Sequence, residues 1–126
     1  MIKKLSIIIP TLNEEKYLPK LLNSIKKQSF KNYEIIVADF NSKDKTRKIA
    51  KKYKCKIVNG GKPSVARNNG AKIAKGNILF FIDADCIINK SFLQVALKEI
   101  KSRNLDAASC YAVPRSKKIS DHATFA

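Results

Sequence analysis

Short apolar runs alternate with amphipathic segments along most of this chain. Runs rich in β-branched residues predict strands at 4–10, 33–40, 55–61 and 77–85, and the segments 13–28, 42–54 and 63–76 between them predict helices. A further helix is predicted at 91–104 and a further strand at 106–114, with Asn13 and Ser91 as N-caps of the first and last helices. This alternation is typical of βαβ units, so we predict an α/β fold with three α/β/α layers and a mostly parallel sheet.

Length and composition predict one small globular domain spanning residues 1–126. Hydrophobic residues make up 44% of the chain, yet no apolar run approaches the ~20 residues of a membrane span. The first residues, MIKKLSIIIP, fit a strand better than a signal peptide. The three cysteines, Cys55, Cys86 and Cys110, form no CxxC pair, which disfavours a disulfide framework or a zinc site and predicts a cytoplasmic location.

The net charge of +16 leaves three interpretations open. Lysines occur in pairs along the whole chain, which favours a solvated basic surface, although attraction to anionic lipid at the inner face of the membrane is an alternative. A nucleic-acid-binding domain would interleave aromatic residues with lysine and arginine, whereas Phe80 and Phe81 lie in a predicted strand, so we expect no nucleic-acid partner. Phosphate-bearing substrates would be attracted to such a surface.

Ligands of open parallel sheets bind at the carboxyl ends of the strands. The residues that follow the predicted strands are 10–14, 39–42, 59–62 and 83–86, and we expect them to converge. Asp83 and Asp85 end the run ILFFIDAD, and residues two apart in an extended strand point to the same side. Two adjacent carboxylates repel one another unless a divalent cation compensates. The pair therefore predicts a metal site, against the alternative of an N-cap followed by an acidic turn residue.

The other candidate residues each have a structural alternative. Asp39 could accept hydrogen bonds from a base or ribose, or form an Asx-turn. Asn13 and Glu14 could cap a helix, and the N–H groups there could attract an anion. Arg67 could clamp a diphosphate or be a surface arginine. The chain has no G-x-G-x-x-G motif, no P-loop and a single histidine, His122, which disfavours dinucleotide oxidoreductases, P-loop NTPases and catalytic triads.

Four segments, taken together and in order, resemble a known family. SIIIPTLNEEKYLPKLLNSI, YEIIVADFNSKDKT, SVARNNGAKIAKG and ILFFIDADC resemble the N-terminal, nucleotide-binding half of family 2 glycosyltransferases, over about residues 4–97. The resemblance implies the Rossmann-like GT-A fold. It also implies that a nucleotide diphospho-sugar, with UDP as the default nucleotide, is the donor for inverting transfer to an acceptor hydroxyl.

The resemblance also assigns roles to the matching positions. Nucleoside contacts are implied for Pro10, Thr11, Asn13 and Glu14. Asp39 would contact the base or ribose, Arg67 the base and diphosphate, and Asp83 the ribose or donor sugar. Asp85, together with Asp83, would coordinate Mg²⁺ or Mn²⁺ on the diphosphate, which stabilises the leaving group.

The chain departs from the family pattern in two places and is short for the family. Phe40 stands where a second acid or a serine is common after Asp39, and Cys86 where a third acid is common after Asp85. The acceptor-binding half and the catalytic base lie downstream in the family, and we identify no base here. The chain is therefore interpreted as a truncated donor-binding domain. Whether it is a fragment of a longer enzyme, a short form that needs a partner, or a non-catalytic nucleotide-sugar-binding module stays open.

The expected partners follow from the same resemblance. The acceptor would be a glycan, a polysaccharide or a lipid carrier, and the last of these fits a protein at the membrane surface. A truncated sheet would also expose apolar surface, which favours a homo-oligomer.

Overall fold

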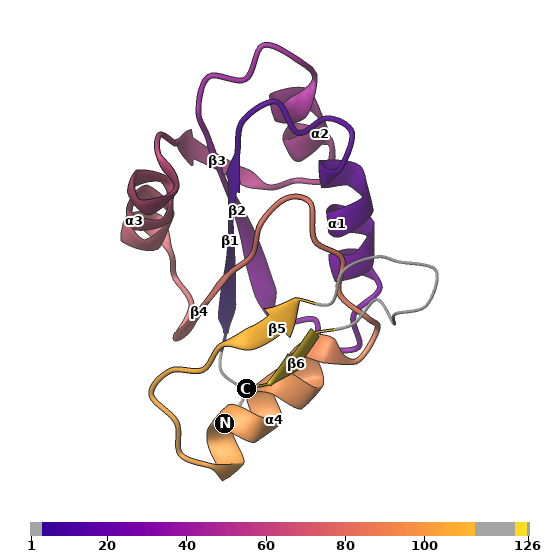
Figure 1. Cartoon of the computed structure of the whole chain (residues 1–126), viewed down its shortest axis with the longest axis vertical. Coiled ribbons are helices and arrows are strands. Elements are labelled where there is room, and N and C mark those ends of the chain that lie inside the picture. The colour runs from indigo at the N-terminus through magenta and orange to yellow at the C-terminus, as the bar shows by residue number, and fades with distance from the viewer. Residues whose placement is uncertain (1–3, 113–122, 126) are drawn as a thin grey trace. The chain divides into compact units, whose positions relative to one another are not determined.

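The computed structural model describes residues 4–112 and 123–125 and divides the chain into two compact units. The first unit contains residues 1–19 and 32–85, and the second contains residues 20–31 and 86–126. The elements, in chain order, are β1 (Leu5–Thr11), α1 (Leu18–Lys26), β2 (Tyr33–Asp39), α2 (Thr46–Lys52), β3 (Lys56–Asn59), α3 (Pro63–Ile73), β4 (Ile78–Phe81), α4 (Phe92–Ser102), β5 (Cys110–Ala112) and β6 (Ala123–Phe125) (Figure 1).

The first unit is built on a four-stranded parallel sheet with the order β3-β2-β1-β4. The central strand β1 reads LSIIIPT, and its first five residues are buried. A parallel strand covered on both faces needs this kind of continuous apolar run rather than alternation. The register pairs Thr11 at the end of β1 with Asp39 at the end of β2, which brings the carboxyl ends of the two strands level.

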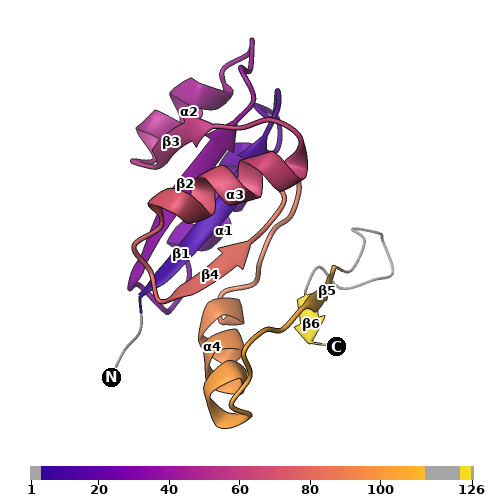
Figure 2. The same ribbon diagram turned by 90° about the vertical axis from the view of Figure 1, so that its left-hand side faces the viewer.

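Helices α2 and α3 cover opposite faces of this sheet (Figure 1). The β2-α2-β3 connection moves outward to one edge, whereas β3-α3-β4 returns across the sheet to the other edge, and right-handed crossovers then place the two helices on opposite sides. Figure 2 shows α3 crossing in front of β1 and β2. The helix approaches closely because Gly70 faces β1: a Cβ there would lie 2.5 Å from Ile8 Cγ2. The predicted α/β fold with three layers is confirmed.

In the second unit, the end of α1 is tied to the start of α4 by a buried glutamine. Gln28 Nε2 donates to the carbonyl of Asn89 (2.5 Å), and Gln28 Oε1 accepts the N–H of Leu93 in the first turn of α4 (3.0 Å). Ser91 occupies the N-cap position, as predicted, but makes no side-chain capping hydrogen bond. A residue more than sixty positions away supplies the acceptor instead.

Two predicted boundaries next to the strand ends are wrong, and one strand was not predicted. The first helix begins at Leu18, not after Asn13, because Asn13 has a left-handed φ of 53° that an N-cap does not adopt. Strand β4 ends at Phe81, so Asp83 and Asp85 lie beyond it. Strand β6 was not predicted; it pairs antiparallel with β5. Within the described residues, no helix is long and apolar enough to span a membrane. That residues 1–126 are a single domain lacking an acceptor half stays a prediction.

Candidate functional site at the carboxyl edge of the sheet

The candidate site lies in the first unit, where β1, β2 and β4 end. The chain leaves β1 toward β2 on one side, and β4 arrives on the other side of β1 from the far edge. The strand order therefore reverses between β1 and β4, which is the position where open α/β sheets bind ligands. Pro10 is half-buried and Thr11 buried at the end of β1, and their contact with a nucleoside stays a prediction.

Asp39 is the best-anchored residue at this edge. Its carboxylate accepts hydrogen bonds from Thr11 Oγ1 (2.6 Å), Ser42 Oγ and N–H, and Arg47 Nε (2.7 Å), and its side chain is 0% exposed. Burial acts to raise the pKa of this carboxyl, but the hydrogen bonds from Ser42, Thr11 and Arg47 outweigh it and the pKa is lowered. Asp39 is thus a buried anion held by the chain's own donors, and contact with a base or ribose stays a prediction.

The third strand also joins this anchor. The N–H of Gly60 donates to the carbonyl of Asp39 (2.8 Å), and a Cβ on Gly60 would lie 2.7 Å from the carbonyl oxygen of Ala38. The backbone after β3 therefore needs a glycine to come this close to the end of β2. Asp39 consequently links the loops that follow three strands.

The loop after β1 is held by side chains of the loop after β2. The N–H groups of Asn13, Glu14 and Glu15 donate to Ser42 Oγ (2.8 Å), Thr46 Oγ1 (2.8 Å) and Asp44 Oδ2 (3.1 Å), respectively. Asn13 Oδ1 in turn accepts the N–H of Lys43 (2.8 Å). The predicted role of these residues as a helix cap is therefore wrong, and their N–H groups are not free to bind an anion. They join two loops instead.

Sequence reasoning did not identify the residues that hold these loops together, namely Ser42, Thr46 and Arg47, although it expected the segment 39–42 at this edge. A signal for two of them was present, because small hydroxyl and carboxylate side chains clustered just after a predicted strand often bond to nearby backbone. This signal predicts hydrogen bonds within the same loop, such as the one that the N–H of Thr46 donates to Asp44 Oδ1 (2.9 Å). The bonds to Asn13 and Glu14 join residues about thirty positions apart, and no local sequence pattern predicts them.

Carboxylates from three loops converge beside this anchor. Burial raises the pKa of the Glu14 carboxyl above its usual value, and the negative charges of Asp85, Asp44 and Asp83 raise it further. Asp83 and Asp85 are exposed, while Ile82 and Ala84 are buried, so the alternation of the strand continues past its last hydrogen-bonded residue. Glu14, Asp83 and Asp85 are thus near enough for their charges to interact, and a shared role in binding a ligand stays a prediction.

Arg67 reaches the same group of residues from α3. Its Nη2 lies 3.7 Å from Asp83 Oδ1, and the two side chains are 43% and 66% exposed. A pair this exposed contributes little to stability. It does place a guanidinium, a good partner for phosphate oxygens, beside the exposed carboxylates.

The donor set suits a hard divalent cation that substrate oxygens help to hold. Asp83 and Asp85 supply two carboxylates, and Mg²⁺ is commonly bound by one or two carboxylates together with substrate phosphates. Among the residues that the structure describes, no group of three or more His, Cys, Asp or Glu side chains is arranged to hold a metal. The chain thus fits an open site and not a closed protein cage.

Comparison with known proteins identifies the family. The glycosyl transferase family 2 model matches residues 6–123. Two poly(ribitol-phosphate) beta-N-acetylglucosaminyltransferases of Staphylococcus aureus are similar in sequence: TarS of strain MW2 is 39% identical over 113 residues, and TarP of strain N315 is 34% identical over 114. These alignments cover 82% of this chain but only 20% of TarS and 35% of TarP.

Solved structures agree. The crystal structure of S. aureus TarS 1-349 in complex with UDP-GlcNAc matches with a TM-score of 0.74 and 37% identity over 85% of this chain and 33% of that one. A mannosyltransferase from Pyrobaculum calidifontis, solved with GDP-Man and Mn²⁺, matches at 24% identity with a TM-score of 0.72, which is a likeness of fold. The family resemblance read from the sequence is confirmed: this chain belongs to glycosyl transferase family 2.

Proposed function

We propose that this chain binds a nucleotide diphospho-sugar at the carboxyl edge of β1, β2 and β4 and serves as the donor-binding part of a glycosyltransferase. The observation that carries the proposal is the convergence of Glu14, Asp83, Asp85 and Arg67 at the point where strand order reverses. TarS, which shares 37% identity with the chain, was solved with UDP-GlcNAc, and this supports a UDP-sugar as the first donor to test.

In this proposal the nucleoside lies over the ends of β1 and β2. Pro10, Thr11, Asn13 and Glu14 line its pocket. Asp39 is enclosed by Thr11, Ser42 and Arg47, so its role is to hold the surrounding loops in place, and direct contact with the base requires one of these donors to move. These hydrogen bonds would hold the loops of the nucleoside half in place before the donor arrives.

The diphosphate lies toward β4 and α3. Asp85 and Asp83 would hold Mg²⁺ or Mn²⁺, which when bound stabilises the negative charge that develops on the leaving diphosphate. Arg67, which pairs with Asp83, would be able to bind a phosphate oxygen instead if a cation compensated the Asp83 carboxylate. Asp83 also faces the ribose or the donor sugar.

Transfer requires more than these residues. The inverting mechanism needs a base that deprotonates the acceptor hydroxyl, and no described side chain takes that role. The chain spans about a fifth to a third of the two staphylococcal relatives, so we propose that the acceptor half and the base belong to a further segment or partner. The acceptor is a glycan, a polyol-phosphate polymer or a lipid carrier, and we propose a cytoplasmic protein that meets it at the membrane surface.

Isothermal titration calorimetry of the full chain with UDP, UDP-GlcNAc and GDP, with and without Mn²⁺, tests the donor site. We expect metal-dependent binding of one nucleotide, reduced at least tenfold in Asp85→Asn because one of two carboxylate ligands is lost. Asp106→Asn is the matched control, since Asp106 is exposed, lies in the second unit and changes the net charge equally. Equal affinity in the two variants, or no binding by the unaltered chain, would refute the assignment.

A further inference from the structure

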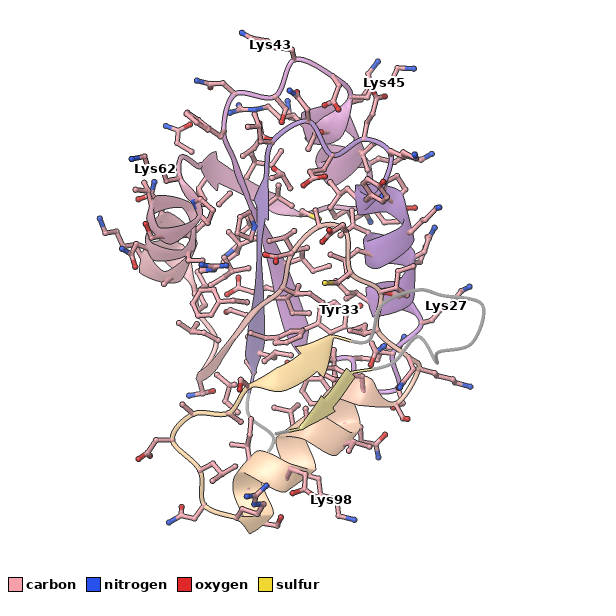
Figure 3. The ribbon with its side chains drawn as sticks, in the orientation of Figure 1. Lys27, Tyr33, Lys43, Lys45, Lys62 and Lys98 are labelled. Atoms are coloured by element: carbon pink, nitrogen blue, oxygen red, sulfur yellow. The ribbon has the colours of Figure 1, made fainter. Side chains whose placement is uncertain are left out.

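Helix α2 presents a dense row of lysines to solvent. We define the α2 lysine face as Lys45, Lys48, Lys51 and Lys52, together with Lys43 in the preceding loop, all exposed. The buried residues of the helix are Thr46 and Ala50. At 100° per residue, the exposed lysines lie on the side of the helix opposite this buried pair. Figure 3 shows Lys43 and Lys45 projecting outward at the end of the unit where the strands finish.

This row of charges is unfavourable for the free protein. Lysines three and four positions apart repel one another, and a helix of seven residues has little intrinsic stability to offset that. No described carboxylate pairs with any of these lysines. Asp44, the one acidic residue between 43 and 54, has its carboxylate bonded to Thr46 and to the N–H of Glu15. An anionic partner would relieve this repulsion.

We propose that the α2 lysine face docks on an anionic lipid bilayer. Ile49 and Tyr53 of the helix are only partly exposed, and the exposed Phe40 lies before Lys43 and outside the row of lysines. The proposed interaction is therefore electrostatic and needs no inserted side chain or stacked base. Diffuse headgroup charge suits lysine ammonium groups, which are strongly hydrated point charges. Helix α2 begins at the carboxyl edge of the sheet, so this docking holds the candidate site near the bilayer. The inference extends the proposed membrane-surface location and does not depend on donor binding.

Sedimentation of the full chain with phosphatidylglycerol-containing vesicles tests the docking surface. In Lys48→Gln/Lys51→Gln/Lys52→Gln we expect vesicle affinity to fall about 100-fold, from roughly fivefold per lysine removed near the bilayer. The matched control, Lys90→Gln/Lys98→Gln/Lys101→Gln, removes the same charge from exposed positions before and along α4 and should change affinity less than about threefold. Binding should vanish on pure phosphatidylcholine and weaken steeply with salt.

Three results would overturn the proposal. If the unaltered chain does not bind anionic vesicles, the docking proposal is refuted. Equal losses in the two triple variants would show that net charge, not this face, governs binding. If poly(U) RNA binds the unaltered chain more tightly than the vesicles do, and the α2 variant alone loses it, the face belongs to a nucleic-acid partner. Circular dichroism of all variants controls for folding, and donor titration is run separately, so failure of one proposal leaves the other measurable.

Discussion

The carboxylate of Glu34 links several segments at the amino-terminal edge of the sheet. Its removal should lower the free energy of unfolding by an amount that depends on pH. Glu34 Oε2 accepts hydrogen bonds from Ser6 Oγ and from the N–H of Lys75 (2.6 Å), and Oε1 pairs with Lys56 Nζ at 2.8 Å. Burial acts to raise the pKa of this carboxyl, but the hydrogen bonds from Lys56, Ser6 and Lys75 and the charge of Lys56 lower it from 4.5 to about 2. These contacts secure the connection from α3 to β4, at whose far end Asp83 lies.

The magnitude follows from linkage. A folded pKa below the unfolded one stabilises the protein above the unfolded value, near pH 4.5, and this stabilisation is lost as pH falls toward 2. The full shift corresponds to about 3 kcal/mol, which we reduce to about 2 kcal/mol because solvent screens the half-exposed Lys56. Glu34→Gln should therefore lower the free energy of unfolding by about 2 kcal/mol at pH 7. At pH 3.5 the loss should be only about 1 kcal/mol.

Urea unfolding of both proteins at intervals from pH 7 to pH 3.5 measures this difference. Glu99→Gln is the control, because Glu99 makes only an exposed pair with Arg103 at 3.8 Å, which should contribute less than about 1 kcal/mol. A Glu34→Gln deficit that stays constant across this range would refute the reasoning, since it would show that the side chain acts through packing and not through its charge.

Three further predictions concern packing and reactivity. Gly70→Ala should lower the free energy of unfolding by about 1–2 kcal/mol in urea, because the overpacking against Ile8 outweighs the gain of about 1 kcal/mol in helix propensity; an unchanged or higher value would contradict this. Gln28→Ala should cost about 2–3 kcal/mol and speed hydrogen exchange at the Leu93 amide, which loses its buried acceptor; unchanged exchange there would show that the cap is dispensable. Cys55 is partly buried, and burial raises its pKa to about 12, so iodoacetamide at pH 8 should modify this thiol far more slowly in the folded protein than after unfolding in urea; equal rates would contradict this.

The parallel sheet was predictable because its signal is local. Strand β1 is buried on both faces, and a continuous run such as Ser6 to Ile9 between amphipathic segments has few other uses. The carboxyl-edge rule then brought Thr11, Asp39 and Asp83 to one end of the sheet without any knowledge of strand order. That order, which locates the reversal beside β1, depends on pairings that the sequence pattern does not encode.

Contacts distant in sequence explain what was not predictable. The pattern around Asn13 predicts a helix cap, yet the N–H groups of Asn13 and Glu14 bond to Ser42 and Thr46, and Asn13 turns left-handed to allow this. Likewise Ser91 is a residue type that often caps helices, but the N–H of Leu93 donates to Gln28 Oε1 and not to Ser91. In both places, hydrogen bonds to residues that come close only in the folded chain override the local preference for a helix cap.

The candidate site combines a rigid part and an open part, and their chemistry explains the difference. Burying the Asp39 carboxylate would cost several kcal/mol if it were unpaired, so donors from Thr11, Ser42 and Arg47 must be in place for the unit to fold, and the loops they belong to are ordered before any ligand arrives. Asp83 and Asp85 are exposed, and in the proposed donor complex a bound cation would compensate their charge. Nucleoside binding should therefore need little reorganisation, whereas cation binding should depend strongly on the diphosphate that completes its ligand set. If the proposed function holds, this coupling would favour capture of the intact donor over capture of either metal or nucleoside alone.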